Sequence, residues 1–109
     1  MATVTTPPIT WQWPAGVLDF AARNHVDIYL DPLLEATRRV YPTARSLRVQ
    51  MELDPELRDE WHIRFTVEVP AQDIPNYARA QHAWGKELFR VCPAPLVCIF
   101  RLFLIPVKP

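Results

Sequence analysis

The stretch LVCIFRLFLI spans Leu96 to Ile105, lies between Pro95 and Pro106, and holds nine apolar residues and one charge, Arg101. Successive side chains of a strand point to opposite sides of its sheet, so this stretch would be apolar on both faces. Strands that are buried on both faces have this composition. The stretch therefore predicts a final strand that brings apolar side chains to a second sheet face, and something has to cover that face.

Two earlier stretches, residues 47–53 and 61–69, alternate between apolar and polar side chains. This period of two predicts the two strands of a hairpin with one apolar and one charged face. The charged face of the hairpin would carry Arg48, Glu52, His62, Arg64 and Glu68. The apolar face needs a covering layer of helices.

Three stretches have helical spacing of their apolar residues: residues 14–24, residues 27–41 and residues 74–91. The last is the longest, and its apolar stripe fits the apolar face of the hairpin. Residues 1–10 predict a flexible N-terminal arm, and residues 11–109 a single domain. The element order is therefore α-α-β-β-α-β, which indicates an α+β fold, a two-layer sandwich with helices on one face of a three-stranded sheet.

The position of the last strand is the open point of this topology. A strand, a helix and a strand return the chain in its original direction, so the last strand should run parallel to the second and antiparallel to the first. Beside the first strand it completes a mainly antiparallel sheet of order 2-1-3. Beside the second it forms a parallel pair. We expect the first arrangement.

The second sheet face would carry Val97, Ile99, Arg101, Phe103 and Ile105. Leaving its four apolar side chains in water would forgo about 1.5 to 3 kcal/mol each. Two covers are possible. The first helix, with Trp11 and Trp13, would cover the face within the chain. Alternatively, a second copy or another protein would bind it, or would add a strand to the edge of the last one.

The sequence offers no catalytic or metal-binding motif. Its single serine, Ser46, lies in no nucleophile motif, its two glycines form no phosphate-binding loop, and its histidines lack metal-ligand spacing. We therefore expect no catalytic residue, no metal and no cofactor. The charged face of the hairpin is the alternative, because arginines there would bind anions or assist acid and base catalysis with the acidic residues and His62.

The balance of charges, the N-terminal sequence and the cysteines indicate which partners and which cellular location to expect. Twelve basic residues balance twelve acidic ones, which argues against a nucleic-acid partner. The apolar run is too short to span a membrane, and residues 1–10 lack the pattern of a signal peptide, so we expect a cytoplasmic protein. Cys92 and Cys98 are expected to be buried, reduced thiols, because their spacing does not fit a zinc site.

Together these observations predict a non-catalytic interaction protein, an adaptor or an antitoxin-like or immunity-like partner. It would form a homodimer or bind another protein. The interface would comprise the second sheet face, the last strand and the two tryptophans, Trp11 and Trp13. The alternative is a small acid/base enzyme or an anion-binding protein that uses the charged sheet face.

Overall fold

The computed structural model describes residues 11–53, 56 and 60–108, so the expected arm at residues 1–10 lies outside the described residues. The described elements are, in chain order, α1 (Ala15–Arg23), η1 (Asp27–Tyr29), α2 (Leu30–Val40), β1 (Ser46–Leu53), β2 (Trp61–Pro70), η2 (Ala71–Asp73), α3 (Tyr77–Val91), η3 (Ala94–Ile99) and β3 (Phe100–Val107), where η marks a short 3-10 helix. This order confirms the predicted α+β fold. All three predicted helices and both hairpin strands are present.

The described strands form one mixed sheet in the order β1-β2-β3. Strand β1 pairs with β2 antiparallel, and β3 pairs with β2 parallel. The predicted direction of β3 is confirmed, but the expected order 2-1-3 is wrong. Strands that follow one another in the chain tend to be neighbours, and α3 returns the chain over β2 to the position beside it. The sheet is therefore mixed rather than mainly antiparallel.

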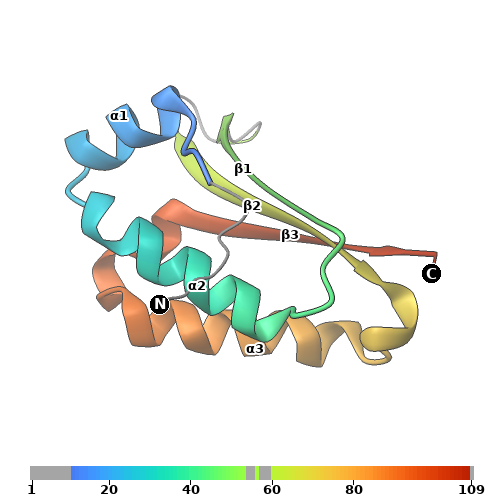
Figure 1. Cartoon of the computed structure of the whole chain (residues 1–109). Coiled ribbons are helices and arrows are strands. Elements are labelled where there is room, and N and C mark those ends of the chain that lie inside the picture. Colours follow the sequence, from blue (N-terminus) through green and yellow to red (C-terminus); the bar gives the residue numbers. More distant parts are fainter. Residues whose placement is uncertain (1–10, 54–55, 57–59, 109) are drawn as a thin grey trace, which may run out of the picture.

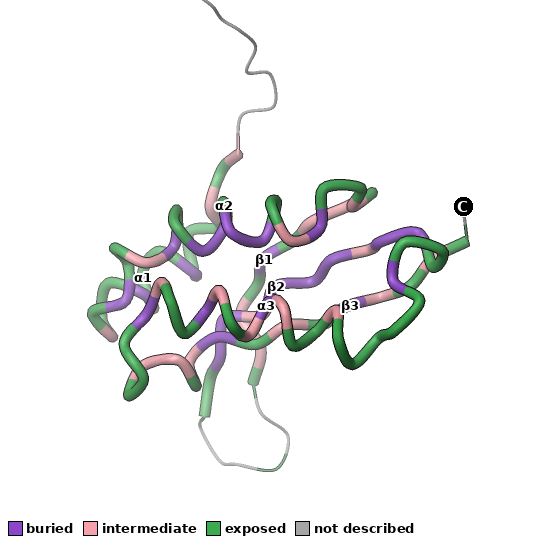
Figure 2. The backbone as a smooth tube through the Cα atoms, turned by 90° about the horizontal axis from the view of Figure 1, so that it is seen from below, coloured by how far each residue is buried: buried purple, intermediate pink, exposed green. Residues whose placement is uncertain are grey.

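The three α-helices pack on one side of this sheet, which we call the inner face (Figure 1). Helices α2 and α3 run side by side beneath it, and buried positions cluster where they meet the strands (Figure 2). The ring of Phe65, on β2, lies at the centre of this layer, with its centroid 5.9 Å from that of Trp84 on α3. The fully buried side chains Val17 and Ala21 bring α1 into the same core.

Strand β3 begins at Phe100, four residues later than expected. The preceding residues form η3, which starts after Pro93 and has a proline in its first turn. Proline fixes φ near −65°, which suits the start of a helical turn better than an extended strand. Val97 and Ile99 are therefore not strand residues. Both are half-buried and pack against the core.

Candidate functional site

The face of the sheet opposite the helices, here called the outer face, holds the side chains of every second strand residue. Its rows are Arg48, Gln50 and Glu52 on β1, then His62, Arg64, Thr66 and Glu68 on β2, then Arg101, Phe103 and Ile105 on β3. The structure thus brings all five predicted ligand-binding residues of the hairpin onto one face. Of the five residues assigned to that face from the last strand, it retains three.

The charges of the outer face are paired across strands. Arg64 Nη1 lies 2.7 Å from Glu52 Oε2, and Arg48 Nη2 lies 3.9 Å from Glu68 Oε2. The Arg64 guanidinium also lies over the Phe103 ring, with Cζ 5.3 Å from the ring centroid. Arg64 is therefore held between an acid on β1 and an aromatic ring on β3. An anionic ligand would have to displace Glu52 to bind it.

His62 is the most buried charged or titratable group on the outer face, with 3% of its surface exposed. Its Nε2 lies 3.1 Å from Arg101 Nη2 and 3.8 Å from Glu60 Oε1. A guanidinium can only donate, so where the two groups hydrogen-bond Arg101 is the donor and Nε2 the acceptor. Nδ1 is buried and has no hydrogen-bond partner. A substrate proton directed at Nε2 would have to displace the Arg101 guanidinium.

Unpartnered polar atoms are concentrated on this face. Among the described residues, three buried polar side-chain atoms of the outer-face row of β2 have no hydrogen-bond partner: His62 Nδ1, Arg64 Nε and Thr66 Oγ1. Such atoms are usually paired in folded proteins. Within the described chain these three atoms are left without a hydrogen-bond partner.

Phe103 is the exposed apolar side chain of the outer face, at 48% exposure, and Ile105 beside it is half-buried. The expected set of four apolar residues on the face is thus wrong, because Val97 and Ile99 belong to η3. The apolar surface that needs a cover is smaller than predicted. It is centred on Phe103, on the edge strand.

Trp11 and Trp13 lie on the inner face of the sheet, so they cannot belong to an interface on the outer face. The Trp13 ring packs against Phe65 on the inner face, with centroids 6.3 Å apart, and its Nε1 donates to Asp31 Oδ1 at 2.8 Å. Trp11 packs edge-on against Trp13, with centroids 5.4 Å apart. The proposal that α1 and these tryptophans cover the outer face within the chain is therefore wrong.

The free edge of β3 is partly blocked. The hydroxyl of Tyr77 donates to the backbone carbonyl of Leu104 at 2.8 Å. Pro106, within the strand, has no N–H to offer to an added strand. Two features that natural proteins use against edge pairing thus occur in the second half of β3. A partner strand would find few free groups there.

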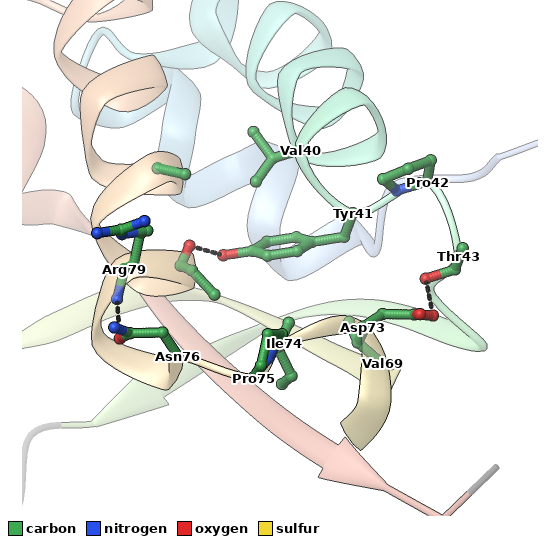
Figure 3. A pocket seen from close by; sticks show the side chains of 12 residues that line it. Val40, Tyr41, Pro42, Thr43, Val69, Asp73, Ile74, Pro75, Asn76 and Arg79 are labelled. Carbon is green, nitrogen blue, oxygen red and sulfur yellow. Dashed lines mark hydrogen bonds between the residues drawn. The ribbon is translucent and has the colours of Figure 1, made fainter.

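A cavity of about 500 Å³ opens between the end of α2, η2 and the start of α3 (Figure 3). The Tyr41 ring extends across it, and its hydroxyl donates to the Ala80 carbonyl at 2.7 Å. Burial raises the pKa of the Tyr41 phenol well above its usual range, and Tyr77 adds to the effect. Thr43 Oγ1 donates to Asp73 Oδ2 at 2.8 Å. The Tyr41 and Thr43 hydroxyls and the Asp73 carboxylate are thus engaged in hydrogen bonds within the chain.

Sequence reasoning missed this cavity because its wall comes from three separate segments.

The cysteines also differ from expectation: Cys92 is buried, but Cys98 is exposed, and both are free thiols. Burial raises the pKa of the Cys92 thiol, and Cys98 raises it further. Among the described residues, no group of three or more His, Cys, Asp or Glu side chains could hold a metal ion.

No protein-family model matches the chain, and neither a curated protein nor a solved structure gives a significant match. Over the described residues, the helices are too short or too polar to span a membrane.

Proposed function

We propose that this chain is a non-catalytic interaction protein that forms a homodimer through the outer face of its sheet. The observation that carries the proposal is the one-sided packing. The α-helices of the described chain lie on the inner face, while the outer face presents Phe103 half-exposed above buried polar atoms that lack partners. An apolar side chain surrounded by polar groups is the usual anatomy of an interface.

Charge favours a second copy as the partner. The outer face mixes cationic Arg48, Arg64 and Arg101 with anionic Glu52 and Glu68, so it does not present a single sign of charge that would repel its own copy. The whole chain has a formal net charge of zero, so two copies do not repel each other at long range. A self-complementary patch is what a two-fold dimer requires.

The size of the face sets the expected affinity. Three strands about 4.8 Å apart and eight residues of about 3.3 Å give a face of roughly 14 Å by 26 Å. Its area of about 360 Å² is a little under half of the roughly 800 Å² that each partner buries in a standard interface. The proposed dimer is therefore weak and depends on concentration. The blocked edge of β3 favours contact through the face over strand addition.

Two further features support a cytoplasmic location and an interaction face rather than a ligand-binding site. The free thiols of Cys92 and Cys98 fit a cytoplasmic location, where cysteines stay reduced. The ion pairs of Arg64 and Arg48 favour an interaction face over the alternative, an anion-binding or acid/base site on the same residues, because both arginines already have acidic neighbours.

Sedimentation velocity over a hundredfold range of protein concentration tests the dimer. The wild-type chain should shift from monomer towards dimer as its concentration rises, and Phe103→Glu should remain monomeric. Phe89→Glu is the matched control, because Phe89 is 61% exposed on α3, in the helical layer. Circular dichroism confirms that each variant is folded. A wild type that stays monomeric throughout, or a dimer lost in Phe89→Glu but kept in Phe103→Glu, overturns the proposal.

A further inference from the structure

A second cavity, of about 410 Å³, lies between the end of α2, the start of β1 and the indole of Trp11. Its wall includes Trp11, Arg38, Tyr41, Arg45, Leu47 and Val67. Leu47 and Val67 are paired inner-face residues, so this cavity is on the side of the sheet opposite the proposed dimer face. Its volume falls in the range of small-molecule sites, about 300 to 1,000 Å³.

Among the described residues, the wall of this cavity has cationic side chains and no acidic one. Within the described residues, neither Arg38 nor Arg45 forms an ion pair. Helix α2 ends here, and the partial negative charge of a helix C-terminus, about half an elementary charge, opposes an anion. Two guanidinium groups outweigh it. The cavity is therefore electropositive, in contrast to the outer face, where arginines have acidic neighbours.

The indole of Trp11 supplies a hydrogen-bond donor without an acceptor. Its Nε1 is buried and has no partner. Indole nitrogens can only donate, and a buried donor without an acceptor is costly. The indoles of Trp13 and Trp84, by contrast, donate to Asp31 Oδ1 and Thr37 Oγ1. The Arg38 guanidinium lies over the Trp11 ring, with Cζ 5.9 Å from its centroid, so a cation and the unpaired donor are neighbours.

We propose that this cavity binds a small organic oxyanion, a planar apolar body that carries one carboxylate or phosphate group. The arginines attract the oxyanion through charge-assisted hydrogen bonds, and the indole of Trp11 turns so that Nε1, which has less than 1 Å² of accessible surface in the unliganded chain, donates to it. The apolar body packs against Tyr41, Leu47 and Val67. This site goes beyond the proposed dimerisation, because it uses residues outside the outer face.

Nuclear magnetic resonance of the indole N–H groups tests the site in the full chain. Benzoate and phenyl phosphate are the probes, and benzyl alcohol is the neutral comparison. Titration with either anion should move the Trp11 indole resonance, assigned with Trp11→Phe, because that N–H gains an acceptor. The resonances of Trp13 and Trp84 should move little, since both donors already have acceptors. Benzyl alcohol should bind at least tenfold more weakly than the anions.

The variant Arg45→Gln should weaken benzoate binding about tenfold, because it removes one charge-assisted hydrogen bond. Arg79→Gln is the matched control, since Arg79 lines the other cavity, and it should bind as the wild type does. The proposal is overturned if neither anion moves the Trp11 resonance, if benzyl alcohol binds as tightly as benzoate, or if Arg45→Gln binds benzoate unchanged. Inorganic phosphate that binds as tightly as phenyl phosphate would also overturn it, because the apolar wall would then contribute nothing.

Discussion

The indole Nε1 of Trp84 donates a hydrogen bond of 2.9 Å to Thr37 Oγ1, and this bond joins α3 to α2 inside the core. Both residues are buried, with 4% and 1% of their surface exposed. The Thr37 hydroxyl in turn donates to the Leu33 carbonyl at 2.7 Å. The Thr37 hydroxyl therefore accepts one hydrogen bond from the indole and donates another within α2.

Thr37→Val should destabilise the protein by about 1 to 3 kcal/mol. Valine keeps the shape of threonine but leaves the Trp84 indole N–H buried without an acceptor. Urea unfolding followed by circular dichroism measures the change. Thr37→Ser is the control, since it keeps the hydroxyl and loses one methyl group, and it should cost about 1 kcal/mol or less. A Thr37→Val protein as stable as the wild type would show that the hydrogen bond contributes nothing.

His25→Gly should stabilise the protein by about 0.5 to 1 kcal/mol. His25 has a φ of 59°, in the left-handed region, and follows the end of α1. The N–H of Val26 donates to the Ala21 carbonyl and that of His25 to the Ala22 carbonyl, which is the Schellman arrangement. Glycine adopts this conformation without the penalty of about 1 to 2 kcal/mol that a Cβ carries, although it loses more backbone entropy on folding.

Thermal unfolding tests this substitution, because 1 kcal/mol corresponds to about 4 to 8 °C for a domain of 60–100 residues. His25→Ala is the matched control, since it removes the imidazole but keeps the Cβ. It should not raise the melting temperature. An equal gain in both variants would assign the effect to the lost imidazole rather than to backbone strain.

The helices and the hairpin could be predicted from the sequence, because their apolar spacing reports which side of each element faces a core. The alternation of residues 47–53 and 61–69 also placed Arg48, Glu52, His62, Arg64 and Glu68 together on one face, as the structure shows. The order of the strands in the sheet could not be predicted from this alternation. Both arrangements of β3 give the same alternation, and they differ only in which neighbour α3 brings it to.

Other features depend on contacts between distant residues. Trp13 was assigned to the outer face because a tryptophan needs a cover, but Phe65 and Asp31, its partners on the inner side, lie far along the chain. The prolines before Val97 were read as a boundary, whereas they favour a helical turn that shortens β3. The two cavities likewise have walls assembled from several segments, which no local pattern reports.

The stability of the protein should fall above about pH 10, and Tyr41→Phe should reduce the fall. The folded state raises the pKa of Tyr41, chiefly because the phenol is buried and further because Tyr77 lies near it. The unfolded chain ionises at about pH 10. The stabilisation from the neutral phenol is therefore complete below pH 10 and is lost as pH rises further, by up to about 1.4 kcal/mol per pH unit.

Urea midpoints measured from pH 8 to pH 11 test this dependence. Tyr41→Phe loses one hydrogen bond, about 1 kcal/mol, at pH 8, but its midpoint should fall less steeply between pH 10 and pH 11. Tyr77→Phe is the comparison: it leaves burial, the larger cause of the raised pKa of Tyr41, unchanged, so most of the alkaline slope should remain. Parallel curves for the wild type and Tyr41→Phe would contradict the assignment.

The two thiols should react with Ellman's reagent at very different rates in the folded protein. Cys98 is exposed, and its Sγ has one weak contact, 4.0 Å from the Pro95 carbonyl. Cys92 is buried at the end of α3, and its raised pKa lowers the fraction of reactive thiolate. If Cys92 reacts only through global unfolding, a stability of about 5 kcal/mol slows its reaction by more than roughly 10³-fold.

Cys98→Ala should therefore remove the fast phase of the reaction, and Cys92→Ala should keep it. Urea should make Cys92 reactive in the Cys98→Ala protein. A fast phase that persists in Cys98→Ala would place Cys92 within reach of solvent and contradict the packing of α3 described above.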